Sequence, residues 1–198
     1  MTCGSLLQSN PDSFTGCQSC ELWQWRTQVV PGHGSIDAKI AFVAEAPGRE
    51  EDAKGEPLVG PAGQRFDRQI ERVGVAREDV WLDNAVHCRP PDNDLRAHPD
   101  ALARCPSLWL TPTLDALESL RVVVVLGATA GGLWFPGEKA TAIASLARNT
   151  GKVVVVGSFH PSYALRSGGE WNEIDDAIVR SIQRALVYAN LLEVATWK

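Results

Sequence analysis

Four short apolar segments alternate with longer stretches of helical spacing, and this alternation constrains the fold more than any other feature. The segments are Lys39–Ala44, Asp79–Asn84, Arg121–Leu126 and Lys152–Gly157. The last two are runs of valine, which is typical of strands buried on both faces of a parallel sheet. Strands that alternate with helices indicate right-handed βαβ units. We therefore predict a three-layer α/β/α sandwich around a four-stranded, mostly parallel sheet.

The stretches between these strands carry apolar side chains at helical spacing. Residues 62–73 and 171–192 both present one apolar face, so each is predicted to be an amphipathic helix packed on the sheet. Residues 99–120 are also expected to be helical, with a break near Pro112. The arginines in and after the first stretch are expected to be solvated: Arg65, Arg68, Arg72 and Arg77.

Composition and charge exclude several classes of protein. A chain of 198 residues with 44% hydrophobic side chains can bury a core, so it is not a disordered or low-complexity protein. We predict one domain over residues 1–198, with residues 1–16 loosely ordered. A net charge of −5 argues against coating nucleic acid by bulk positive potential. Without an apolar membrane span, a signal peptide or a sustained heptad, we expect a cytoplasmic monomer with no membrane contact.

The segments that follow the four strands are candidates for the functional site. They begin at residues 44, 84, 126 and 158, and most are rich in proline, glycine and polar residues. Ligands of parallel α/β sheets bind beyond the carboxyl ends of the strands. We therefore expect the site to be assembled from these loops.

Five cysteines point to a second chemical feature. Cys17 and Cys20 form a C-x2-C pair, and Cys88 and Cys105 could complete four soft ligands, which leaves Cys3 without a role. A C-x2-C turn places two thiolates on one side of a bend, as zinc and iron–sulfur sites require. The alternatives are a redox dithiol for the pair and ordinary core positions for the other two. Spacing does not decide between zinc and an iron–sulfur cluster.

Five motifs, in order along the chain, give these features a family resemblance. They are C-x2-C, E-A-P-G-x-E-E-D, G-x-P-x-V-G-x-A-G-Q, N-x-V-x-C-R-P-P followed by a further cysteine, and H-P-S-Y-x-L-R, and they run from Cys17 to Arg166. The chain thereby resembles the family-four, iron–sulfur uracil-DNA glycosylases. The resemblance implies a glycosylase fold and hydrolytic excision of uracil from DNA during repair, leaving an abasic site. It also implies a [4Fe–4S] cluster on four ligands: Cys17, Cys20, Cys88 and Cys105.

The resemblance also assigns residues to a base pocket. His160 matches the histidine that hydrogen-bonds uracil O2, and Asn84 matches the asparagine that pairs with the O4 and N3 edge. Glu45 and Asn93 match positions implicated in activity. Ala46, Pro47 and Gly48 match a loop that lies against the water and the base. Glu51 matches a residue near uracil C5, where it could exclude the methyl group of thymine. Leu58 stands at the position of a stacking side chain. Glu50 and Asp52 are expected to be solvated.

A DNA-contacting segment is implied as well. Residues 162–166 resemble the loop that enters the minor groove, with Ser162 at its start and Leu165 as the wedge that fills the vacated stack. Arg166 and Arg89 are candidates for contacts with phosphates.

The chain departs from the family pattern at two positions, which keeps other functions open. Leu58 stands where the family usually carries an aromatic residue that stacks on uracil, and Ala44 replaces the glycine before Glu45. A base–aromatic stack is worth about 1–3 kcal/mol. One alternative is therefore a superfamily member with altered base specificity, or with tight or covalent binding to the uracil site. The other is a non-enzymatic nucleic-acid-binding domain with structural zinc.

Overall fold

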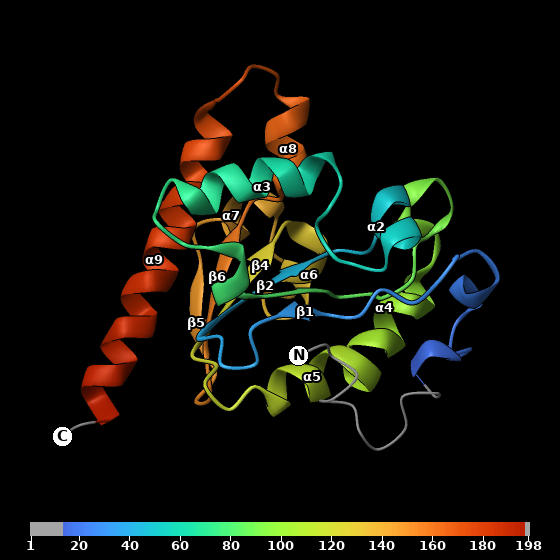
Figure 1. Ribbon diagram of the computed structural model, residues 1–198, viewed down its shortest axis with the longest axis horizontal. Coiled ribbons are helices and arrows are strands. Elements are labelled where there is room, and N and C mark those ends of the chain that lie inside the picture. Colours follow the sequence, from blue (N-terminus) through green and yellow to red (C-terminus); the bar gives the residue numbers. More distant parts are fainter. Residues whose placement is uncertain (1–13, 197–198) are drawn as a thin grey trace.

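Six strands form one mixed sheet in the computed structural model, which describes residues 14–196, with side chains described as far as residue 190 (Figure 1). The strand order is β1-β3-β2-β4-β6-β5. The bounds are β1 His33–Gly34, β2 Ile40–Ala44, β3 Trp81–Asn84, β4 Val122–Leu126, β5 Ala147–Asn149 and β6 Val154–Ser158.

The four predicted strands form the parallel centre of this sheet. β3, β2, β4 and β6 pair in parallel, and every residue in them is buried. The prediction of four strands omitted two edge strands, β1 and β5, which pair antiparallel to β3 and β6. These have only two and three residues, and β5 is exposed throughout. Neither carries the apolar run that marks a buried strand.

Helices cover both faces of the sheet, which confirms the three-layer architecture (Figure 1). The α-helices are α2 Arg49–Lys54, α3 Pro61–Glu71, α4 Pro99–Cys105, α5 Thr111–Ala116, α6 Ala128–Gly132, α7 Ala140–Ile143, α8 Pro161–Arg166 and α9 Glu173–Thr196. Short 3-10 turns are η2 Glu21–Gln24, η3 Arg77–Asp79, η4 Pro91–Asn93 and η5 Leu95–Ala97, and η6 Pro106–Leu110 is a π-helical turn.

Alternate side chains of each central strand contribute to two separate cores. Phe42 and Val124 point to the face covered by α3, α8 and α9, where they pack with Phe66 and Ile178. Their neighbours point to the opposite face, where they pack with residues of α5, η6 and the α6–α7 segment, including Leu110, Leu114, Phe135 and Ile143. This two-sided burial is why the strands read as continuous apolar runs.

The expected helices are present with small shifts. The 62–73 prediction corresponds to α3, and the 171–192 prediction corresponds to α9. Residues 99–116 run without interruption through α4, η6 and α5, so the expected break near Pro112 is only a change from π-helical to α-helical geometry at Thr111, and the helix ends at Ala116, before the expected residue 120. Among residues 14–196, no helix is long and apolar enough to span a bilayer.

The segment expected to be loosely ordered, residues 1–16, ends with three described residues, of which Phe14 is buried. Residues 1–13 lie outside the described residues, but Phe14 is buried and packs edge-on against His87 and Trp109. An aromatic ring buries a large apolar area, so Phe14 anchors the start of the described chain to the cysteine-containing segment.

Candidate functional site

A cavity of about 1040 Å³ lies at the carboxyl ends of β2, β3, β4 and β6. Strands that run parallel end at the same edge of a sheet, so the four loops that follow them meet there. The cavity brings together nearly all the predicted base-pocket and DNA-contacting residues: Glu45, Ala46, Pro47, Gly48, Glu51, Leu58, Asn84, Arg89, Asn93, Ser162, His160 and Arg166. Leu165 is the exception. It lies on α8, 36% exposed, outside the cavity lining.

Asn84, the last residue of β3, presents an unpaired amide to this cavity. Its side chain is 3% exposed, and its Nδ2 atom has no hydrogen-bond partner among the described residues. A buried donor without a partner costs about 1–3 kcal/mol, so it marks a place where a ligand acceptor belongs. The backbone N–H of Asn84 donates to Asp83 Oδ1 at 2.8 Å, which fixes the end of the strand.

His160 is held at the start of α8 as a neutral hydrogen-bond donor. Its Nδ1 atom accepts from the backbone N–H of Ser162 at 3.1 Å, so the ring proton resides on Nε2. Burial, assisted by the nearby Arg166, lowers the pKa of His160 to about 4. The hydroxyl of Ser162 lies 2.9 Å from the same Nδ1 and accepts a bond from Arg166. The ring is therefore oriented by its own helix.

Glu45 follows β2 and is held by a residue that follows the neighbouring strand β4. The hydroxyl of Thr129, on α6, donates to Glu45 Oε2 at 2.6 Å. Because Glu45 and Thr129 both line the cavity, this contact fixes a carboxylate where a water or a sugar could meet it. No motif in the sequence pointed to Thr129, since its partner lies 84 residues away.

Glu51 links the two loops that form one wall of the cavity. Its carboxylate accepts backbone N–H bonds from Gly48, Val59 and Gly60 at 3.1, 3.0 and 2.8 Å. These bonds use both carboxylate oxygens. Glu51 therefore sets the spacing between the loop after β2 and the loop before α3, and its expected place near the C5 atom of a base stays a prediction.

Leu58 stands in that wall in a left-handed backbone conformation. Its φ is 54°, and its side chain is 5% exposed. The conformation is sparsely populated for side-chain-bearing residues and is maintained by surrounding contacts. Arg77 donates to the carbonyls of Pro57 and Leu58, and Gly63 makes room, because a Cβ there would lie 1.8 Å from Leu58 O.

Two of the expected solvated side chains are buried instead. Asp52 is 3% exposed and accepts backbone N–H bonds from Thr27 and Gln28. Arg65 is 2% exposed and pairs with Asp175. Both expectations were wrong because each partner is far away in the sequence, and local charge patterning does not reveal it.

Asn93 and Arg89 interact at the mouth of the cavity. Arg89 Nε donates to Asn93 Oδ1 at 2.9 Å, and Asn93 is exposed with a φ of 56°. The amide of Asn93 thus helps to orient the guanidinium of Arg89, and both residues line the cavity.

The four predicted ligand cysteines line one small pocket, away from the main cavity. Burial raises the thiol pKa of Cys20 and raises that of Cys88 to about 11, and the neighbouring Cys105 acts in the same direction on both. Arg26 Nη1 donates to Cys88 Sγ at 3.1 Å. Among the described residues, no three His, Cys, Asp or Glu side chains are arranged to hold a single metal ion. Cys3 lies outside the described residues.

A buried chain of polar contacts joins this pocket to the end of β3. His87 Nδ1 lies 3.3 Å from Cys105 Sγ, and His87 Nε2 lies 2.8 Å from Asp83 Oδ1. Asp83 also accepts from Trp81 Nε1 and from the backbone N–H of Asn84. Burial alone would lower the pKa of His87, but Asp83 and Cys105 raise it to about 10. No motif in the sequence points to this pair, because the burial of Asp83 in a strand beside His87 depends on the tertiary structure.

Comparison with known proteins places the chain among glycosylases. The family model described as the uracil DNA glycosylase superfamily matches residues 31–182. A protein of Thermotoga maritima named Type-4 uracil-DNA glycosylase is 38% identical over 173 residues, covering 85% of this chain and 87% of its own length. Proteins of the same name from Sulfurisphaera tokodaii and Saccharolobus solfataricus are 33% and 40% identical, covering 80% and 59% of this chain and 76% and 53% of their own lengths.

Proposed function

We propose that this chain, which belongs to the uracil-DNA glycosylase superfamily, flips uracil out of DNA and hydrolyses its N-glycosidic bond, leaving an abasic site. The observation that carries the proposal is that two hydrogen-bond donors line the same cavity. One is the unpartnered Nδ2 of Asn84, and the other is the neutral Nε2–H of His160. A base that presents carbonyl acceptors would satisfy both of them.

Asn84 is proposed to read the base. Its Nδ2 would donate to uracil O4, while its Oδ1 accepts from N3–H. Cytosine has an amino donor at the first position and an acceptor at the second, so the same amide would meet two mismatches. Reading by a buried amide gives strong discrimination, because a mismatched base leaves its buried polar atoms unpaired.

His160 is proposed to stabilise the leaving group. When the bond from the sugar C1′ to the base N1 breaks, its electron pair stays on the base and the negative charge spreads to O2. The hydrogen bond from a preoriented N–H to that oxygen is stronger in the transition state than in the ground state. Because the ring of His160 is neutral, it donates a hydrogen bond and gives up no proton at neutral pH.

Glu45 is proposed to act on the sugar side. Loss of the base leaves an oxocarbenium-like C1′, to which a water oxygen adds, and the water proton needs an acceptor. The Glu45 carboxylate, fixed by Thr129, can orient that water and accept the proton. Asn93 is proposed to support the reaction from the mouth of the cavity through Arg89.

DNA is proposed to be held by a few local contacts. Leu165 is exposed on α8 beside the cavity, where it could enter the space that a flipped base vacates. Ser162, Arg166 and Arg89 would meet the backbone around it. With a net charge of −5, weak non-specific binding is expected. A cytoplasmic monomer is proposed on sequence grounds, because the chain carries no sustained heptad and its cysteines fit ligand positions better than a disulfide scaffold.

The four cysteines are proposed to hold a [4Fe–4S] cluster. An all-thiol donor set around one pocket fits iron–sulfur ligation, and Arg26 offers positive charge to one sulfur. Zinc is the alternative, because four thiolates also suit a structural zinc ion and their spacing does not decide between the two. When bound, the cluster would cross-link the C-x2-C segment to the loop after β3 and to α4, without taking part in a hydrolysis that transfers no electrons.

Strand nicking at a single deoxyuridine tests the function. The protein is incubated with a duplex containing one deoxyuridine, and alkali then cleaves any abasic site; the same duplex with thymidine is the control. We expect nicking only with deoxyuridine. Leu58, in place of a stacking aromatic, favours a second candidate, excision of another deaminated base. A hypoxanthine duplex therefore forms a third arm, and nicking there without nicking at uracil would replace the proposal by that candidate.

A further inference from the structure

The turn between α8 and α9 is organised by one side chain, Asn172. Its Nδ2 donates to the carbonyls of Ala164 and Gly168, both at 2.8 Å. Its Oδ1 accepts from the backbone N–H groups of Ile174 and Asp175 at 3.0 and 3.3 Å. A single amide therefore satisfies carbonyls at the end of α8 and amide groups at the start of α9, which helix ends otherwise leave unpaired.

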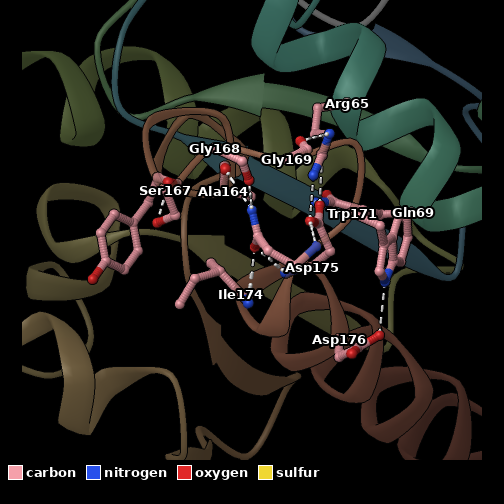
Figure 2. A network of polar contacts seen from close by, with 12 residues as sticks. Arg65, Gln69, Ala164, Ser167, Gly168, Gly169, Trp171, Ile174, Asp175 and Asp176 are labelled. Carbon is pink, nitrogen blue, oxygen red and sulfur yellow. Dashed lines mark hydrogen bonds and ion pairs between the residues drawn. The ribbon is translucent and has the colours of Figure 1, made fainter.

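Asp175 connects this turn to α3. Its side chain is fully buried, and its Oδ2 accepts from the backbone N–H of Asn172 at 2.8 Å. Arg65 donates to both carboxylate oxygens, and Gln69 donates to Oδ1 at 2.8 Å. Arg65 Nη1 also reaches the carbonyl of Gly169 at 3.3 Å. Figure 2 shows Asp175 at the centre, with α3 on one side and the turn on the other.

Trp171 covers the outer side of the same cluster. Its indole N–H donates to Asp176 at 2.8 Å, and the guanidinium of Arg72 lies 5.0 Å from the ring centroid. Two glycines with φ near +80°, Gly168 and Gly169, allow the chain to turn sharply beneath it. The turn is thus tied to α3 and α9 by charged, aromatic and backbone contacts, although it is exposed at its tip.

We infer that Asn172 is a positioning residue for the DNA wedge: it holds the end of α8 against α9 and α3 so that Leu165 and Arg166 keep a fixed place beside the cavity. This inference rests on the proposed function. α8 has only six residues and cannot hold its own direction. His160 fixes its first turn through Ser162, whereas Asn172 fixes its last turn through Ala164. A wedge has to resist the stacked duplex, so the second anchor is needed for duplex DNA and is dispensable for a single strand.

The variant Asn172→Asp separates this role from ordinary helix capping. Aspartate caps a helix start as well as asparagine does, so the contacts to Ile174 and Asp175 are retained. Its carboxylate has no N–H to donate to Ala164 or Gly168. Asn172→Ser is the uncharged second variant, because serine also caps but is too short to reach both carbonyls. The matched control is Ser167→Ala, which removes a side-chain bond to the Tyr163 carbonyl of α8 without touching α9.

Uracil release is measured under single turnover on duplex and single-stranded DNA, with 2-aminopurine beside the deoxyuridine to report unstacking. We expect both Asn172 variants to lose about 10- to 100-fold in kcat/KM on the duplex, with a matching loss of the unstacking signal. Their rate on single-stranded DNA should stay within about threefold, and Ser167→Ala should match the parent on both. Equal losses on the two DNA forms, or none on the duplex, would overturn the inference. A parent protein that releases no uracil from either form would instead refute the proposed function, and the inference with it.

Discussion

The backbone N–H of Ser162 donates a hydrogen bond to Nδ1 of His160 at 3.1 Å. A peptide N–H can only donate, so this bond fixes the tautomer of the imidazole and places its proton on Nε2. The same bond makes His160 the N-cap of α8. His160, which is proposed to stabilise the leaving base, is therefore oriented by α8. The same helix carries the proposed DNA wedge, so α8 serves both bond cleavage and the opening of the DNA.

Uracil release should be independent of pH through neutrality and into mild acid. Burial and Arg166 lower the pKa of His160 to about 4, so the ring stays neutral well below its ordinary value of 6.5. In the unfolded chain the ring takes up a proton near pH 6.5, so its contribution to stability falls as pH drops from there toward 4. The check is a single-turnover pH profile with a parallel unfolding curve. An acid limb in the rate centred near pH 6.5 would contradict the assignment.

Asn84→Ala should separate recognition from stability. Removing an amide whose Nδ2 has no partner leaves the melting temperature unchanged or raised, because the folded protein loses no side-chain donor bond. The kcat/KM for uracil should fall by about 10- to 100-fold, since the base loses its partner. Asn84→Asp, which keeps the shape but not the donor, should lose as much activity as Asn84→Ala. A large drop in melting temperature with Asn84→Ala would show that Asn84 is structural.

The sequence predicts those site residues that directly follow a buried strand. Asn84 and His160 lie directly after apolar strand runs, and parallel strands bring such positions together, so their meeting in one cavity could be expected. It was uninformative where a contact depends on tertiary structure. The partners of Arg65 and Asp52 are 110 and about 25 residues away, and β5 forms from three exposed residues that pair only because β6 lies beside them.

Breaking the buried pair between Arg65 and Asp175 should strongly destabilise the fold. Arg65 is 2% exposed and Asp175 fully buried, so Arg65→Ala leaves an uncompensated charge, which costs about 3–5 kcal/mol. Burial opposes ionisation, but bonds from Arg65 and Gln69 lower the pKa of Asp175 below 3.8. The pair's contribution to the stability of the fold is therefore complete above pH 3.8 and is lost as the pH falls through the lowered pKa of Asp175. Urea unfolding of Lys152→Ala, which breaks an exposed pair with Asp115, is the control and should show little change.

Loss of one proposed cluster ligand should abolish visible colour and lower stability together. Cys88→Ser should yield a protein with less iron and sulfide and a reduced melting temperature, because the cross-link among the cysteine segments is lost. Cys3→Ser is the control, since Cys3 is assigned no ligand role, and it should match the parent. Iron analysis and a visible spectrum decide the matter. A colourless parent that contains stoichiometric zinc would contradict the cluster assignment.

Hydrolytic excision of uracil is best tested by counting the products from one deoxyuridine duplex under single turnover. Free uracil, abasic sites and detergent-resistant protein–DNA complexes are quantified together, for the parent and for His160→Ala. We expect equal amounts of uracil and abasic DNA with no stable complex, and a rate about 10²- to 10³-fold lower for His160→Ala. No free uracil, or a stable protein–DNA complex in its place, would contradict the claim that this chain is a hydrolytic uracil-DNA glycosylase.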